Sequence, residues 1–264
     1  MNHGMTCVNW GIYHFVQALY NSVIKYAGSF NAMIYDLHIY KHFKLTKESY
    51  GGSMTGITIE GKKKMRKSIQ SITDKIKQER QYNNKIYYAS DMEYLASEIL
   101  SAMPDTTDDR NSCITPVVSI AKAMGFDTFQ QDLLWFLSGC IGINKKYIKK
   151  FKTDHIIFTN RKVHPYQQRF VIAHELAHYL FDYDHTSEVY YNTYKKNSHS
   201  AEAEKRANAF AASLLMPKDA FLKEYNKARA KSNNPIFILD YLSDTFKAPR
   251  KSVLKRMYEV GCYA

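Results

Sequence analysis

Two histidines that are four residues apart, with a glutamate directly after the first, occur in the stretch RFVIAHELAHYLF, residues 169–181. On a helix, positions i and i+4 lie on one face about 5–6 Å apart, so His174 and His178 could bind one metal ion together. Glu175 would then project beside the pair, where it could accept a proton from water bound to the metal. The spacing predicts a catalytic zinc site on a helix that begins near Pro165.

The residues around this motif are apolar, so the alternative is a buried structural helix that carries the spacing by chance. From Phe170 to Phe181 every residue outside the motif is uncharged. Two imidazoles and a carboxylate inside such a helix would be costly without a metal ion to satisfy them, because buried polar groups need partners. We therefore favour a metal site.

A catalytic zinc site needs a third protein ligand beyond the two histidines. His185 is one candidate, but on a continuing helix it would lie about 10 Å further along the axis than His178, which is too far. The stretch HSAEAEKRANAFAASLLMP, residues 199–217, offers a better candidate. At about 100° per residue, Glu204 falls on the apolar face of a helix, and Glu202 points about 160° away, toward solvent. We favour Glu204 as the ligand; the alternative is a buried carboxylate paired with a lysine.

Two neighbours of Glu204 on the same helix have predicted places. Asn208, one turn later, shares the buried face and could accept a hydrogen bond from the free N–H of a metal-bound histidine. Arg206 is predicted on the outer face, beside Glu202 and Lys205.

The two motifs together resemble the ImmA/IrrE family of zinc metallopeptidases. RFVIAHELAHYLF is followed by E-x-x-x-N-A-F-A-A-S-L-L-M-P, and the resemblance covers about residues 112–264, including PVVSIAKAMGF, the SG turn and HIIFTN. The family is similar to gluzincin peptidases, which hold zinc through two histidines and a glutamate on the next long helix. The resemblance implies that His174, His178 and Glu204 bind Zn²⁺ and that Glu175 is the catalytic base. The family often has a second glutamate where this chain has Arg206, which leaves the ligand position intact.

The reaction implied is hydrolysis of a peptide bond, in which zinc acidifies water, Glu175 accepts the proton and zinc polarises the carbonyl. The oxyanion that forms needs a further hydrogen-bond donor. The candidate donors lie in the tyrosine-rich loop between the two ligand helices: Tyr183, His185, Tyr190, Tyr191 and His199. HIIFTN is predicted to be the edge strand that an extended substrate joins through backbone hydrogen bonds.

The resemblance also implies a partner, namely a dedicated protein substrate such as a helix–turn–helix repressor of a mobile element or stress response. A metal-dependent partner protein with negligible proteolysis is a second possibility. The third is a DNA-binding regulator, because the net charge is +12 and residues 238–261 have helix–turn–helix spacing. The second helix of that pair carries four basic residues, Arg250, Lys251, Lys255 and Arg256. The alternative is that these two helices only brace the fold.

Composition limits the class of protein. The 264 residues are 45% hydrophobic and 14% aromatic, which excludes a disordered chain. The four cysteines include no C-x-x-C pair, a pattern typical of a reducing cytoplasm. The sequence shows neither a secretory signal nor an apolar run long enough for a membrane span.

These observations predict an α+β, zincin-like metallopeptidase. A small mixed or antiparallel sheet should pack on the H-E-x-x-H helix, followed by a second ligand helix and C-terminal helices. Runs rich in aromatic and β-branched residues predict the strands, namely FDTFQ, LLWFLSGCIGI and HIIFTN. Periodicity predicts further helices at about 61–81, 90–103, 200–216, 235–246 and 249–260. Two more are predicted from caps: one with Thr115 as cap, Pro116 first and Gly125 past its end, and one starting at Pro217.

Three parts are expected along the chain: an undefined segment at 1–53, a helical region at 54–110 and the metallopeptidase domain at 111–264. Two glycines lie just before Met54, and their codons could form a ribosome-binding site. One hypothesis is therefore that the natural protein starts at Met54 and that residues 1–53 are not translated. The competing hypothesis is an accessory helical segment that packs on the core or docks a partner.

Overall fold

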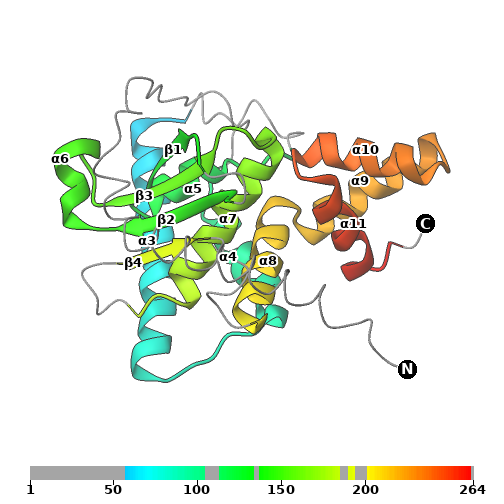
Figure 1. Ribbon diagram of the computed structural model, residues 1–264. Helices are drawn as coiled ribbons and strands as arrows, with labels where there is room; N and C mark the ends of the chain where they lie inside the picture. The colour runs from blue at the N-terminus through cyan, green and yellow to red at the C-terminus, as the bar shows by residue number, and fades with distance from the viewer. Residues whose placement is uncertain (1–56, 105–112, 134–136, 185–189, 194–200, 263–264) are drawn as a thin grey trace, which may run out of the picture. The chain divides into compact units, whose positions relative to one another are not determined.

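A small mixed β-sheet and the helices packed around it make up the described part of the computed structural model (Figure 1). The described residues are 57–104, 113–133, 137–184, 190–193 and 201–262. They all belong to one compact unit, Leu45–Ala264. Both hypotheses about residues 1–53 concern residues outside the described ranges.

The helices predicted from the sequence are all present, with ends within two residues of the expected positions, whereas helix α6, the 3₁₀ turns and strand β4 were not predicted. The helices are α3 (Ile59–Tyr82), α4 (Met92–Ser101), α5 (Val117–Ala123), α6 (Ile148–Phe151), α7 (Pro165–Phe181), α8 (Ala201–Leu215), α9 (Lys218–Lys231), α10 (Pro235–Phe246) and α11 (Arg250–Glu259). The strands are β1 (Asp127–Gln131), β2 (Gly139–Ile143), β3 (His155–Asn160) and β4 (Tyr190–Thr193). Short 3₁₀ turns occupy Ala89–Asp91 and Lys145–Tyr147.

The sheet has the strand order β1-β3-β2-β4. β1 pairs in parallel with β3, whereas β2 pairs antiparallel with both β3 and β4. The predicted α+β class with a small mixed sheet is therefore confirmed. The prediction that HIIFTN forms an edge strand is wrong, because this segment is β3 and has β1 on one side and β2 on the other.

Two segments differ from their predicted secondary structure. Within LLWFLSGCIGI, the strand is confined to Gly139–Ile143. The tyrosine-rich stretch predicted as a loop contributes strand β4, whose Tyr190 and Tyr191 pair with Ile143 and Gly142 of β2. The run YYNT lacks the apolar–polar alternation that indicates a strand, so pairing with β2 and not local pattern decides its conformation.

A glycine allows α7 to lie close to the sheet, along which it runs in Figure 1. A Cβ added at Gly139 of β2 would lie 2.3 Å from Val171 Cγ1 of α7 and 2.6 Å from the Phe158 carbonyl oxygen. Real side chains do not approach so closely, and interiors are packed too densely to yield much. The distance between the motif helix and the sheet therefore depends on this glycine.

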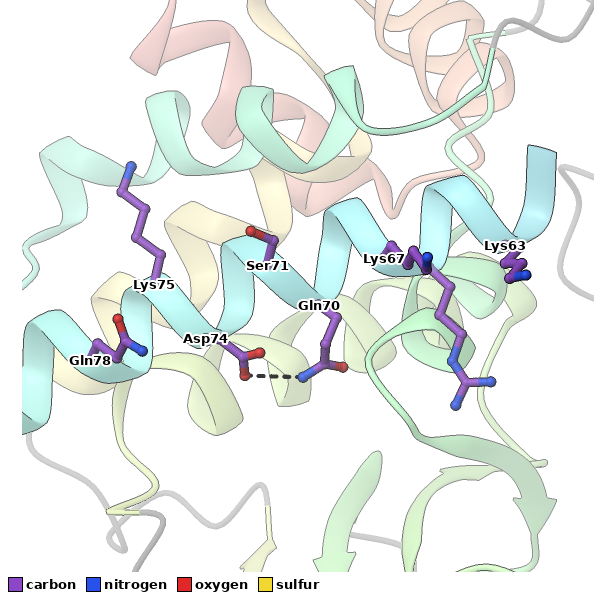
Figure 2. Close-up of a pocket in the computed structure, with 8 residues that line it drawn as sticks. Lys63, Lys67, Gln70, Ser71, Asp74, Lys75 and Gln78 are labelled. Carbon is purple, nitrogen blue, oxygen red and sulfur yellow. Dashed lines mark hydrogen bonds between the residues drawn. The ribbon is translucent and has the colours of Figure 1, made fainter. Parts of the chain in front are cut away.

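Helix α3 has two unlike faces. Met65, Ile69 and Ile76 are buried in the same hydrophobic core as α7 and α8. The opposite face is polar and forms one wall of an open hollow (Figure 2). The residues that line this hollow are Lys63, Arg66, Lys67, Gln70, Ser71, Asp74, Lys75 and Gln78. This face is solvated, and Gln70 Nε2 donates to Asp74 Oδ1 across one helical turn at 3.1 Å.

The C-terminal end of α3 caps the motif helix. Arg80 Nη1 donates to the carbonyl oxygens of Leu180, at 2.9 Å, and Tyr183, at 2.7 Å. Gln81 Nε2 donates to the carbonyl oxygen of Asp184 at 2.8 Å. The last carbonyls of a helix lack intrahelical partners and carry its negative partial charge, so a cation here stabilises the end of α7.

The cap predicted for α5 differs in detail. Pro116 is the N-cap residue, and the hydroxyl of Thr115 donates instead to the Leu214 carbonyl oxygen on α8, at 2.8 Å. The carbonyl of Thr115 accepts from Arg169 Nη2 of α7 at 2.8 Å. This segment therefore links α7 and α8. Gly125, past the end of α5, has the predicted left-handed conformation, with φ of 97°.

The C-terminal helix pair braces the fold through Arg256. Its side chain is 5% exposed, and its Nε donates to the Met216 carbonyl oxygen at 3.0 Å. Its Nη2 contacts Glu93 Oε2 of α4 at 2.6 Å, and the same carboxylate accepts from Ser213 Oγ and from the backbone N–H of Lys218. Arg256 is thus committed to the interior, whereas Arg250, Lys251 and Lys255 are exposed, so burial excludes only Arg256 of the four from contact with DNA.

None of the helices in the described ranges is long and apolar enough to cross a membrane.

We expect Gly139→Ala to lower the free energy of unfolding by about 1–3 kcal/mol, because the added methyl overpacks the interface of β2 and α7. Gly61→Ala is the matched control. That glycine lies in the first turn of α3, where its added methyl would lie 2.9 Å from Cγ2 of Ile57, a partly exposed side chain outside the helix that can shift, so the change should cost much less than Gly139→Ala. Urea unfolding of both variants measures the effects. Equal changes in the two would contradict this account of Gly139.

Candidate metal centre

Helix α7 carries the H-E-x-x-H motif into the interior. Pro165 occupies the first turn, and Nδ1 of the N-cap residue His164 accepts from the backbone N–H of Tyr166 at 3.2 Å. Every residue from Gln168 to Phe181 is buried. A helix that is apolar around its whole circumference belongs in a core, and sequence and burial agree here. His174, Glu175 and His178 are therefore held in a protein interior and not on a surface.

The three predicted ligands come together at one point. His174 Nε2 and His178 Nε2 lie 3.0 Å apart. Glu204 of α8 places Oε2 at 3.5 Å from His174 Nε2 and Oε1 at 3.5 Å from His178 Nε2. Tetrahedral zinc with bonds of roughly 2.0–2.2 Å separates its ligand atoms by about 3.3–3.6 Å. The two distances to Glu204 lie in this range and the histidine pair is slightly closer, so this cluster could hold a metal ion.

Helix α8 orients Glu204 by its helical phase. Ala203, Ala207 and Phe210 are buried against the core, and Glu204 is 26% exposed, with its carboxylate turned to the two histidines. Glu202 is exposed. The predicted difference between the two glutamates is thus present in the structure.

Glu175 is completely buried beside the two histidines. Burial, opposed by the charge of His178 and supported by that of Glu204, raises the pKa of Glu175 to about 8. A carboxylate with a raised pKa is a stronger base than one in water, which suits proton transfer near neutral pH.

Asp182 is a residue of this site that the sequence reasoning missed. His178 Nδ1 donates to Asp182 Oδ2 at 2.5 Å. The prediction for Asn208 named neither histidine, and it stays a prediction. Burial alone would lower the pKa of His178, but hydrogen bonds to Asp182 and Glu204 raise it to about 9. The i,i+4 spacing of His178 and Asp182 on a continuing helix was the available signal.

Arg206 also lies elsewhere than predicted. Its side chain is 14% exposed and forms an ion pair with Asp182, although helical phase alone placed it on the outer face. The reason is that α7 ends at Phe181, so the Asp182 carboxylate faces the flank of α8. Despite its burial, the pKa of Asp182 is held below its usual value by His178 and Arg206.

The structure does not select an oxyanion donor among the five candidates. Tyr183 is buried and its ring stacks on Tyr179, with centroids 5.8 Å apart. Tyr190 and Tyr191 lie in strand β4 and not in a loop. His185 and His199 lie outside the described residues.

The part of the chain that carries this site is similar to a known protein domain. Residues 136–258 match the model of the IrrE N-terminal-like domain of peptidase family M78, and the match includes all three residues of the cluster. Among solved structures, a Mycobacterium tuberculosis transcriptional regulator is similar, with 16% identity and a TM-score of 0.38 over 70% of this chain and 51% of that chain. The present chain thus spans about half the length of that regulator. No curated protein matches the chain by sequence.

Glu204→Ala should weaken zinc binding by more than the roughly 10–100-fold that changes outside the ligand shell cost, because it removes a ligand atom. Glu202→Ala, on the same helix but exposed, should leave the affinity unchanged. Titration against a chromophoric chelator measures both. Equal losses in the two variants would mean that the helical phase does not define the third ligand.

Proposed function

Since residues 136–258 match the IrrE N-terminal-like domain of peptidase family M78, we propose that this protein is a zinc-dependent endopeptidase that cleaves a dedicated regulatory protein. The observation that carries the proposal is the convergence of His174, His178 and Glu204, with Glu175 buried beside them. Two imidazoles and a carboxylate are the donor set of a hydrolytic zinc site, and a second carboxylate beside them can act as the base.

The residues of the chain have distinct roles in this proposal. His174 Nε2, His178 Nε2 and a Glu204 carboxylate oxygen hold the ion. Zn²⁺ supplies Lewis acidity, which lowers the pKa of water and polarises a carbonyl group. The Glu175 carboxylate accepts a proton from water and, once protonated, can pass it to the leaving amine nitrogen. The buried apolar walls of α7 limit access of bulk water, which strengthens each of these electrostatic interactions.

The proposed substrate is a helix–turn–helix repressor of a mobile element or stress response, and the support for it is the family resemblance. The cysteine pattern favours a reducing compartment, and we therefore propose the cytoplasm as the place of action. The alternative is a regulator that binds its partner through this fold without significant proteolysis.

Glu175→Gln should retain about one zinc per chain and lose peptidase activity by roughly 10²–10⁴-fold, because a base is removed and not a ligand. His174→Ala is the control, and it should lose both metal and activity. Metal analysis and cleavage assays on the same preparations separate the two effects. Full activity in Glu175→Gln would contradict the mechanism in which Glu175 is the base.

A purified helix–turn–helix repressor encoded beside this protein should be cut at one or a few bonds, whereas casein should be cut slowly or not at all. Mass spectrometry of the products identifies the bonds, and Glu175→Gln serves as the blank. Rapid digestion of casein without cleavage of the repressor would overturn the dedicated substrate. Stable binding of the repressor without any cleavage would support the non-proteolytic alternative.

A further inference from the structure

A partly buried ion pair adjoins the proposed ligand His178. Asp182 directly follows the last residue of α7, one turn after His178, and its Oδ2 accepts from His178 Nδ1 at 2.5 Å. Its Oδ1 pairs with Arg206 Nη2 of α8. The two side chains are 11% and 14% exposed, so water screens this pair little.

Arg206 reaches three segments of the chain at once. It lies on α8 two residues after Glu204, and through Nη2 it contacts the end of α7. Its Nη1 donates to the Tyr87 carbonyl oxygen at 2.9 Å, in the segment that joins α3 to α4. A planar guanidinium can make these two contacts in fixed directions, which the ammonium group of lysine cannot do.

We propose that Asp182 is a positioning residue for metal binding, and that Arg206 acts through it. With Nδ1 bound to Asp182, the imidazole of His178 presents Nε2 to the point where His174 and Glu204 converge. Arg206 keeps the Asp182 carboxylate in place and fixes the end of α7 relative to α8, and so His178 relative to Glu204. This inference rests on the proposed zinc-dependent function.

The competing explanation is an ordinary ion pair between helices that contributes to stability alone. It predicts that loss of Asp182 or Arg206 lowers the melting temperature and leaves the zinc affinity of the folded chain unchanged. The positioning role predicts a loss of zinc affinity in variants that remain folded. The two explanations therefore differ in a quantity that can be measured without any peptidase substrate.

The first measurement is the zinc affinity of Asp182→Ala and Asp182→Asn, with folding verified by circular dichroism. We expect Asp182→Ala to weaken binding about 10–100-fold. Asp182→Asn should lose less, because its amide oxygen can still accept from His178 Nδ1. Asp184→Asn, an exposed acidic position two residues on, should match wild type. Unchanged affinity in folded Asp182→Ala would overturn the inference.

The second measurement is a double-mutant cycle. Arg206→Met should weaken zinc binding, Arg206→Lys should restore part of the loss, and Lys205→Met should have no effect. If Arg206 acts through Asp182, then the double variant Asp182→Ala with Arg206→Met should bind zinc about as well as Asp182→Ala alone. Fully multiplicative losses would contradict the link between the two residues.

A third measurement reads His178 directly. In the zinc-loaded wild type, ¹⁵N NMR should find the proton of His178 on Nδ1, in a strong hydrogen bond that Asp182→Ala removes. Persistence of the strong hydrogen bond of this proton in Asp182→Ala would also overturn the inference. A wild-type chain that binds no zinc would refute the proposed function itself, whereas a wild type that binds zinc no better than folded Asp182→Ala would refute the positioning role alone.

Discussion

Complete burial of α7 is the constraint on which the rest of the structure depends. A helix whose residues are all buried from Gln168 to Phe181 has no solvent for its polar groups, so each of them must find a partner in the protein or an ion. Glu204 faces the two histidines, Asp182 accepts from His178, and Arg80 takes the last carbonyls. At the other end Arg169, also buried, donates to the carbonyls of Thr115 and Lys247. The surrounding segments are therefore held to α7 by contacts with its polar groups.

Local sequence predicted most of this arrangement because most of it follows from helical geometry. The i,i+4 spacing brings His174 and His178 to one face, and the 100° phase separates Glu204 from Glu202. Both inferences need only that a helix forms, and strong apolar periodicity makes helices the most dependable part of a sequence reading. The α+β class followed from these helices together with short runs rich in aromatic and β-branched residues, which predicted the strands.

What sequence could not supply are the relations between elements. Arg206 has the helical phase of a solvent-facing residue, and only the end of α7 beside α8 makes its position buried. Strand β4 owes its conformation to pairing with β2, and β3 became an interior strand because β1 lies against its other side. Asp182 was within reach of an i,i+4 argument from His178, but the sequence reasoning placed the end of the helix before it and did not apply that argument. Each of these errors concerns a partner that is distant in sequence or just beyond a helix end.

The contact between Arg256 and Glu93 has a consequence for the order in which the chain folds. It joins residues 163 positions apart, whereas the proposed ligands on α7 and α8 are close neighbours in sequence. Closing a long loop costs more entropy than closing a short one, and distant contacts tend to form late. During synthesis, which proceeds from the N-terminus, α7 and α8 also emerge before α11. The helices that would hold the ion can therefore meet before Arg256 is available to Glu93.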